Sequence, residues 1–163
     1  MRIPSLLALL LLLLFGCGKE IGDECINSID CSPNNDRQCI DPSLNGGYCT
    51  IQGCDVDSCP DEAVCVRFFS GGFANKTCDP ATEDLGTDDC SLDELCSLAG
   101  ICVARSSETR FCMRKCGSGD DCRDGYECRD EALMKAHGGE PVPGSPLQDS
   151  QQQAFCATAP SDG

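Results

Sequence analysis

The chain has 163 residues, of which 17 are cysteines, and it contains no tryptophan. It carries 12 Lys and Arg residues against 27 Asp and Glu residues, a formal net charge of −15 at pH 7. Nucleic-acid backbones are bound by clusters of basic side chains, so this balance excludes nucleic acid as an expected partner. Aromatic residues make up only 5% of the chain, too few for a large core. Such a cysteine content in a short chain indicates a small disulfide-rich fold in an oxidising compartment.

Residues 1–16 form an apolar leader. Arg2 supplies one positive charge, and residues 6–15 contain only Leu, Ala and Phe. A membrane-spanning helix needs about 20 apolar residues. A shorter run behind a positive charge is typical of a secretory signal peptide. The end of the leader, Leu14-Phe15-Gly16-Cys17, resembles a bacterial lipobox, although Phe15 stands where that motif prefers a smaller residue.

The lipobox resemblance implies that Cys17 receives a lipid and becomes the mature N-terminus. Setting Cys17 aside leaves 16 of the 17 cysteines, an even number that can pair completely. The alternative is an ordinary signal peptide, with Cys17 as a free or intermolecular thiol. Residue 18 is Gly rather than the Asp that implies inner-membrane retention in enteric lipoproteins. The resemblance therefore favours the outer membrane of a Gram-negative bacterium over the inner one.

The remaining cysteines predict two tandem modules of eight cysteines each. The first set is Cys25, Cys31, Cys39, Cys49, Cys54, Cys59, Cys65 and Cys78, and the second is Cys90, Cys96, Cys102, Cys112, Cys116, Cys122, Cys128 and Cys156. Most of the gaps between successive cysteines agree within two residues, a similarity typical of a duplicated unit. The pairing stays open, because eight cysteines allow roughly a hundred combinations.

This repeat and the surrounding composition predict the organisation of the whole chain. The predicted parts are a lipoprotein signal peptide (1–16), a lipidated tether (17–22), module one (23–79), a linker (80–86), module two (87–157) and a tail (158–163). The linker is assigned from its composition of Pro, Thr, Gly and acidic residues.

The predicted local structure consists of short β-hairpins. The gap between Cys39 and Cys49 contains Asn45-Gly46, a strong turn signal. A hairpin is predicted at the corresponding place in module two, with strands over 101–104 and 110–113. Another is predicted over 63–77, with its turn at residues 70–72.

The insertion before Cys156 predicts two short helices in module two. The first covers 130–136 and ends at Gly138, the residue type that commonly ends a helix. The second begins at Ser145, where Pro146 fits the first helical position, and reaches Phe155.

Three segments resemble parts of known small domains: Asp89-Cys90, Gly100-Ile101-Cys102 and 121–128. The pattern resembles EGF-like and Dickkopf-type cysteine-rich modules, and the short cysteine-repeat lipoproteins of Gram-negative bacteria. This resemblance implies an extracellular binding or structural role.

The residues that carry enzymatic chemistry are sparse. Zinc ribbons and redox sites need Cys-x-x-Cys, and the closest spacing is Cys112-x3-Cys116. The one histidine, His137, precedes two glycines and is predicted to be exposed in a flexible loop, whereas a catalytic base needs rigid support. The chain is predicted not to be an enzyme, and no cofactor is expected.

Calcium is the strongest metal hypothesis. Asp55, Asp57, Asp61 and Glu62 fall within eight residues, and acidic loops of extracellular modules can bind Ca²⁺ weakly. Pro60 stands where an EF-hand loop needs glycine, so a solvated acidic loop is the favoured interpretation.

Phe68, Phe69 and Phe73 lie around the turn predicted at 70–72. They form either a small core or an exposed contact patch. A core is favoured because the apolar face of a hairpin is usually buried against another part of the protein.

Together these features predict a lipid-anchored extracytoplasmic protein that acts as a binding or structural surface module. Its expected partners are the membrane, through the N-terminal lipid, and an unidentified protein or surface. One alternative is a disulfide-stapled protease inhibitor, with Cys78-Asp79-Pro80 or the 103–111 turn as its exposed loop. Another is a weak calcium-dependent adhesion module.

Overall fold

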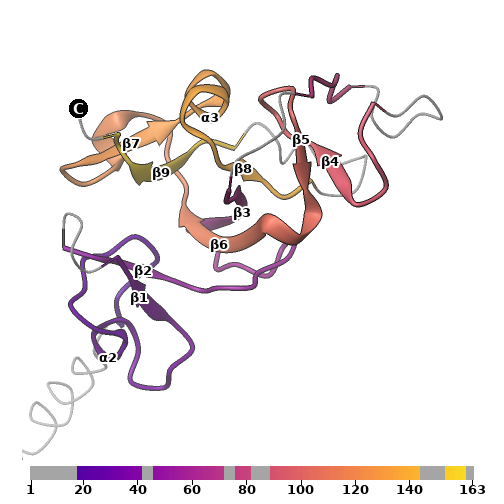
Figure 1. The fold of residues 1–163 in the computed structure, drawn as a ribbon. Coiled ribbons are helices and arrows are strands. Elements are labelled where there is room, and N and C mark those ends of the chain that lie inside the picture. The colour runs from indigo at the N-terminus through magenta and orange to yellow at the C-terminus, as the bar shows by residue number, and fades with distance from the viewer. Residues whose placement is uncertain (1–17, 42–45, 72–75, 82–88, 144–152, 161–163) are drawn as a thin grey trace, which may run out of the picture.

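The computed structural model describes residues 18–41, 46–71, 76–81, 89–143 and 153–160 (Figure 1). The leader and Cys17 lie outside these ranges. The helical elements are α2 (Ser28–Cys31), η2 (Arg105–Ser107), η3 (Gly119–Asp121) and α3 (Glu131–His137). The strands are β1 (Gln38–Ile40), β2 (Tyr48–Thr50), β3 (Ala63–Phe69), β4 (Glu94–Cys96), β5 (Cys102–Ala104), β6 (Glu108–Arg114), β7 (Tyr126–Arg129), β8 (Glu140–Pro141) and β9 (Phe155–Thr158).

The strands form small antiparallel sheets. β1 pairs with β2, β4 with β5 and β7 with β9. β3 lies between β6 and β8 in a three-stranded sheet. Isolated two-stranded hairpins are marginally stable in water, so these sheets need support from elsewhere.

Disulfides supply that support. Every cysteine after Cys17 is bridged: Cys25–Cys39, Cys31–Cys49, Cys54–Cys65, Cys59–Cys112, Cys78–Cys96, Cys90–Cys102, Cys116–Cys128 and Cys122–Cys156. The bridges divide into four units of four cysteines, and in each unit the first cysteine pairs with the third and the second with the fourth. Unit 1 contains Cys25, Cys31, Cys39 and Cys49; unit 2 contains Cys54, Cys59, Cys65 and Cys112; unit 3 contains Cys78, Cys90, Cys96 and Cys102; unit 4 contains Cys116, Cys122, Cys128 and Cys156.

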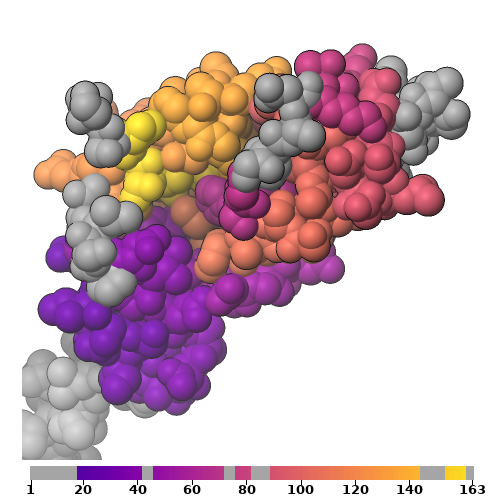
Figure 2. All heavy atoms as spheres, in the orientation of Figure 1, coloured from indigo at the N-terminus to yellow at the C-terminus, as the bar shows by residue number. Residues whose placement is uncertain are grey.

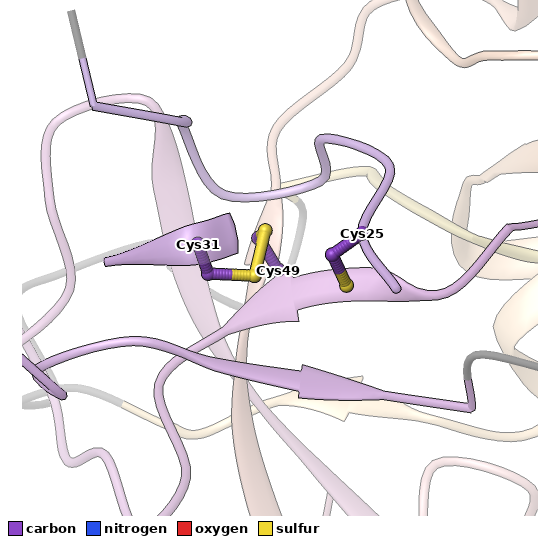
Figure 3. A group of neighbouring side chains, drawn as sticks. All are labelled: Cys25, Cys31 and Cys49. Carbon is purple, nitrogen blue, oxygen red and sulfur yellow. A yellow bond between two sulfur atoms is a disulfide. The ribbon is translucent and has the colours of Figure 1, made fainter. Parts of the chain in front are cut away.

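The four units share one geometry. The third and fourth cysteines are direct cross-strand partners in an antiparallel pair: Cys39 with Cys49, Cys65 with Cys112, Cys96 with Cys102, and Cys128 with Cys156. Their bridges lead to the first and second cysteines, so three sulfurs of each unit lie within 4.8 Å of one another. Figure 3 shows this arrangement in unit 1, where the Cys31–Cys49 bridge lies beside Cys25.

A common turn follows the second cysteine. The carbonyl of the next residue accepts the N–H three positions further on, and the four donor–acceptor pairs are Asn35 to Ser32, Ala63 to Pro60, Glu94 to Ser91 and Tyr126 to Arg123. The pairing scheme and this turn together identify a four-cysteine repeat.

The units are nested rather than strung in series. Unit 3 lies between the third and fourth cysteines of unit 2, and α3 and β8 lie between those of unit 4. β8 then pairs with β3 of unit 2, so the insertion of unit 4 completes the sheet of unit 2. In Figures 1 and 2 unit 1 occupies one end of the molecule, and β4 and β5 of unit 3 lie at the other.

The predicted disulfide-rich class with short hairpins is confirmed, but the layout of two eight-cysteine modules is not. Cys59–Cys112 and Cys78–Cys96 both join residues on opposite sides of the predicted 80–86 linker. The long strands β3 and β6 also pair across it.

The hairpins were predicted with mixed success. The hairpin between Cys39 and Cys49 is confirmed by β1 and β2, with part of its turn (42–45) outside the described residues. Gly47 in this turn has φ +63°, and a Cβ there would collide with the Cys25 carbonyl and the Cys39 sulfur.

The other two predicted hairpins are wrong. β5 and β6 do not pair with each other, because β5 pairs with β4 and β6 with β3. Likewise, Thr77 forms a bridge with Ile101, while β3 pairs with β6 and β8. In both places a long-range partner replaced the strand that was nearest in sequence.

The first predicted helix is confirmed as α3. Asp130 caps its N-terminus by accepting the Leu133 N–H, and Gly138, with φ +80°, ends it. Most of the second predicted helix (144–152) lies outside the described residues. Its expected end at Phe155 is wrong, because that residue belongs to β9.

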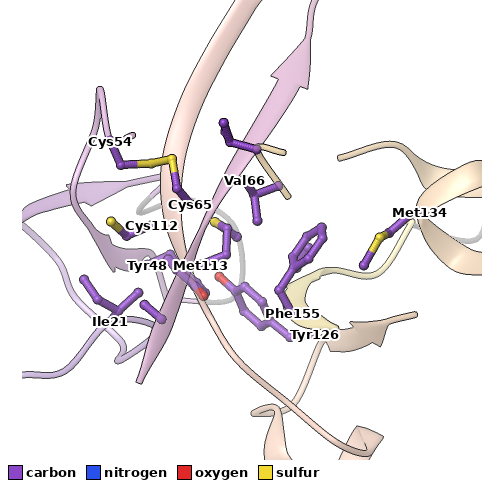
Figure 4. Close-up of a cluster of buried hydrophobic side chains, with 13 residues drawn as sticks. Ile21, Tyr48, Cys54, Cys65, Val66, Cys112, Met113, Tyr126, Met134 and Phe155 are labelled. Atoms are coloured by element: carbon purple, nitrogen blue, oxygen red, sulfur yellow. A yellow bond between two sulfur atoms is a disulfide. The ribbon is translucent and has the colours of Figure 1, made fainter. Parts of the chain in front are cut away.

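The main core gathers side chains from units 1, 2 and 4 (Figure 4). Its buried members are Ile21, Tyr48, Cys54, Ala63, Cys65, Val66, Cys112, Met113, Tyr126, Met134, Val142, Phe155 and Ala157. Phe68 is partly buried and packs against this core, as predicted, and Phe69 is also partly buried. Phe73 lies outside the described residues.

Candidate binding groove

A groove opens where unit 1 meets units 2 and 4. Its volume is about 280 Å³, and it is lined by Ile40, Asp41, Tyr48, Phe68, Phe111, Met113, Tyr126, Arg129, Ala157 and Thr158. We call it the junction groove. The strands β1, β2, β3, β6, β7 and β9 all contribute to its wall.

Strand alternation explains why Phe68, Phe111 and Met113 face the groove together. Successive side chains of a strand point to opposite faces, so Phe111 and Met113 share one face of β6 while Cys112 points to the other. Val66 is the cross-strand partner of Phe111, which places Phe68, two residues further along β3, on the same face. The rings of Phe68 and Phe111 are 6.2 Å apart.

Two stacked tyrosines join unit 1 to unit 4. The rings of Tyr48 and Tyr126 are 5.4 Å apart, and the Arg123 guanidinium lies 4.2 Å from the Tyr126 ring centroid. In Figure 4 the two rings lie next to each other in the core. Arg123 also donates to the Gly47 carbonyl and to the Tyr126 hydroxyl, the latter at 2.6 Å.

The Tyr48 hydroxyl is buried and fully engaged. It accepts the Arg114 N–H at 2.8 Å and donates to the Cys156 carbonyl at 3.3 Å. Burial raises the pKa of this hydroxyl, and burial also raises the pKa of Tyr126, where Arg123 opposes the shift. Both tyrosines therefore present neutral, largely apolar rings at neutral pH.

Arg129 brings a positive charge to the groove, but that charge is already satisfied. Its guanidinium donates to the carbonyls of His137 at 3.0 Å, Gly138 at 2.8 Å and Thr158 at 2.8 Å, and to the Glu127 carboxylate at 2.9 Å. Arg129 thus fixes the end of α3 to β9 rather than offering an open anion site.

The size and chemistry of the junction groove define what it can hold. Small-molecule sites typically occupy about 300–1,000 Å³. The groove lies just below that range and suits one or two apolar side chains. Tyr, Phe and Met are enriched at the centres of protein interfaces, and methionine adapts its shape to different partners.

The structure does not bring the predicted calcium ligands together. Asp55 pairs with Arg110 at 3.0 Å, and Glu62 lies 4.0 Å from Arg37. Asp57 and Asp61 are exposed. Within the described residues, the groups of three or more clustered metal-ligating side chains contain only cysteines, all of them in disulfides.

The prediction that His137 lies in a flexible loop is wrong. It is the last residue of α3, and its Nδ1 lies 2.7 Å from the Glu127 carboxylate that also pairs with Arg129. This arrangement ties the helix end to β7.

The segments proposed for an inhibitor loop are held in secondary structure or turns. Residues 103–111 fall in β5, η2 and β6. Next to the other segment, the Asp79 carboxylate accepts the Ala81 N–H at 3.0 Å, and the Cys78 N–H donates to the Gly100 carbonyl.

No protein-family model, curated protein or solved structure matches this chain. Within the part of the chain that the structure describes, no helix has the length and apolar character needed to cross a membrane.

The groove was not predicted from the sequence, although part of a signal for it exists: Tyr48 and Phe111, which line the groove, each precede the fourth cysteine of their unit. A large apolar residue precedes the fourth cysteine of every unit, and these residues are Tyr48, Phe111, Ile101 and Phe155. Because strand neighbours point to opposite faces, each places a ring or branched chain on the face away from the bridge.

Proposed function

We propose that this chain is a non-catalytic binding module, anchored by a lipid to an extracytoplasmic membrane face. In this proposal the junction groove receives an apolar side chain of a protein partner. The observation that supports it best is the groove itself, where aromatic and methionine side chains from three cross-linked units meet at a partly open site.

The disulfides favour binding as well as stability. Ordering an interface usually lowers affinity, and this cost falls when the binding surface is already rigid. The bridges of units 1, 2 and 4 fix the strands that line the groove. A rigid groove can then bind with little loss of conformational freedom.

Two observations, the bridges and the leader, support the proposed location. Extensive disulfides indicate an extracytoplasmic compartment. The lipobox resemblance supports an acylated Cys17, and Gly18 favours the outer membrane of a Gram-negative host. Several acyl chains on one terminus would give stable anchoring.

Mass spectrometry of the mature chain from a Gram-negative host tests the anchor. We expect an N-terminal peptide that begins with acylated Cys17, and a gain of about 16 daltons on reduction, one hydrogen for each bridged sulfur. An unmodified N-terminus at another residue would overturn the anchor while leaving the groove proposal intact.

Methyl NMR tests the groove with a defined probe. The chain has 3 methionines, and removal of the leader leaves Met113 in the junction groove and Met134 in α3. Titration of the ¹³C-methyl-labelled Cys17→Ser chain with N-acetylphenylalaninamide should shift the Met113 signal and leave Met134 in place. Equal shifts, or none at millimolar probe, would overturn the proposed site.

A further inference from the structure

Three large apolar side chains are strongly exposed among the described residues. They are Ile26 at 79%, Ile29 at 74% and Leu92 at 99%. Ile26 and Ile29 lie three positions apart in unit 1: Ile26 precedes the N-cap Asn27, and Ile29 is in the first turn of α2. Leu92 belongs to unit 3, at the other end of the molecule (Figure 1).

The two isoleucines are held outward by the local structure. Asn27 caps α2, and the Asp30 carboxylate accepts the backbone N–H groups of Ile26 and Asn27 at 2.9 and 3.2 Å. The bridged Cys25 and Cys31 fix the backbone on both sides.

The interior of unit 1 leaves no room for either isoleucine. It is filled by the sulfurs of Cys25, Cys31 and Cys49, each at most 1% exposed. Both isoleucines therefore stay exposed in a fixed position, where another surface can cover them together.

The corresponding turn of unit 4 is polar. Counting from the first cysteine of each unit, Ile26 corresponds to Gly117 and Ile29 to Asp120. The same capped turn therefore forms without apolar residues at these positions, so the repeat itself does not require them. The apolar pair is a particular property of unit 1.

Unit 1 is also the unit next to the predicted anchor. Only Gly18 separates Cys17 from Lys19, whose carbonyl accepts the Arg37 guanidinium and whose ammonium donates to the Glu24 carbonyl. Two residues span at most about 7 Å. A lipid on Cys17 would thus hold unit 1 against the bilayer.

We infer that Ile26 and Ile29 form a bilayer contact, which seats unit 1 on the lipid surface beside the anchor. This inference rests on the proposed lipid anchor. Apolar insertion rather than charge drives the contact, because Asp23, Glu24 and Asp30 lie in the same unit and the whole protein is acidic. Unit 3 then points away from the membrane.

The absence of tryptophan makes this contact directly measurable. The single variants Ile26→Trp, Ile29→Trp and Leu92→Trp each introduce one fluorophore at an exposed position. Each lipidated protein is mixed with phosphatidylcholine vesicles that carry bromine on their acyl chains. We expect at least twofold quenching and a blue-shifted emission for Ile26→Trp and Ile29→Trp, and unchanged emission for Leu92→Trp.

Sedimentation of the same samples distinguishes the lipid anchor from the bilayer contact of the isoleucines. Protein that sediments with the vesicles but shows equal emission changes at all three positions retains the anchor and overturns the bilayer contact. Protein that stays in the supernatant overturns both. Quenching confined to the two unit 1 variants, together with sedimentation, supports both.

Discussion

Units 1 and 4 share a local design. Each has crossed bridges and a capped turn between its first two cysteines, with Asn27 and Asp30 in unit 1 and Ser118 and Asp121 in unit 4. In both turns the aspartate before the second cysteine accepts two backbone N–H groups. The two units differ in what lies beneath their bridges.

Beneath its bridges unit 1 has a separate cluster of cysteines and reaches the main core mainly through Tyr48, whereas unit 4 supplies a larger share of that core. The small cluster of unit 1 consists of Cys25, Cys31 and Cys49, with Cys39 against it. Unit 4 contributes Tyr126, Met134, Phe155 and Ala157 to the main core. Crossed bridges around a cysteine cluster therefore close a unit that adds little to the main core, and the longer insertion of unit 4 allows the same design to supply more of that core.

Removing the bridge of the main core should have the largest effect. The Cys59→Ser/Cys112→Ser variant opens a bridge with a sequence separation of 53 residues. Loop-closure entropy predicts a loss of about 4 kcal/mol in the free energy of unfolding. Urea titration measures this loss in the free energy of unfolding. A loss below about 1 kcal/mol would contradict the prediction that this bridge stabilises the main core.

Removing a bridge of unit 1 should have a smaller and local effect. The Cys31→Ser/Cys49→Ser variant opens a separation of 18 residues, for which the same entropy predicts about 3 kcal/mol. Because unit 1 has only a cysteine cluster of its own, we expect amide-exchange protection to fall in β1 and β2 and to persist in β3 and β6. Equal loss in all four strands would show that unit 1 is not an independent region.

The sequence was sufficient for the fold class but not for the repeat. The cysteine content predicts a disulfide scaffold, whereas the frame of two modules assumes that bridges stay near in sequence. Unit 3 is inserted between Cys65 and Cys112, so counting cysteines in order assigns Cys78 and Cys112 to the wrong neighbours. An aspartate precedes the second cysteine in units 1, 3 and 4, at Asp30, Asp89 and Asp121, and would have aligned these three units; in unit 2 the position is Ser58.

The groove could be predicted only in part. Aromatic residues before Cys49, Cys112 and Cys156 mark one face of each hairpin, and that much is visible in the sequence. Their meeting depends on contacts between hairpins, such as the bridges of Gln52 with Phe111 and of Lys115 with Phe155. These long-range pairings depend on tertiary packing, which hydrophobic periodicity does not reveal.

Removing one atom, the hydroxyl oxygen of Tyr48, should weaken the contact between units 1 and 4. Tyr48→Phe removes the hydroxyl that joins the Arg114 N–H to the Cys156 carbonyl and leaves both groups without this partner. We expect a loss of about 1–3 kcal/mol at neutral pH, measured by urea titration. A variant as stable as the parent would mean that the stacked rings and the hydrogen bond from Arg123 to the Gly47 carbonyl join the two units without this hydroxyl.

Alkaline pH tests the same hydroxyl. Burial raises the pKa of Tyr48 above the ordinary tyrosine value near 10. Its contribution is therefore complete below about pH 10 and falls as pH rises further, because the unfolded chain then loses the proton first. The free energy of unfolding, measured at a series of pH values above about 10, should therefore fall less steeply with pH for Tyr48→Phe than for the parent.

The smallest effect concerns the capped turns that units 1 and 4 share. Backbone N–H groups lower the pKa of Asp30, with Ile26 as the leading donor, and those of Gly117 and Ser118 lower the pKa of Asp121. A carboxylate with a lowered pKa stabilises the fold above its unfolded value near 4 and loses this contribution as pH falls through the folded value.

Asp30→Asn and Asp121→Asn should therefore weaken the fold slightly at pH 7 and leave it unchanged near pH 2. The exposed Asp124→Asn is the matched control and should behave as the parent at both pH values. The two turns should also differ from each other. In unit 1, which supplies fewer side chains to the main core, Asp30→Asn should increase amide exchange in β1 and β2, whereas the larger core of unit 4 should keep β7 and β9 protected in Asp121→Asn. Equal exchange in both units would show that the capped turn, rather than the core beneath it, determines how firmly each unit is closed.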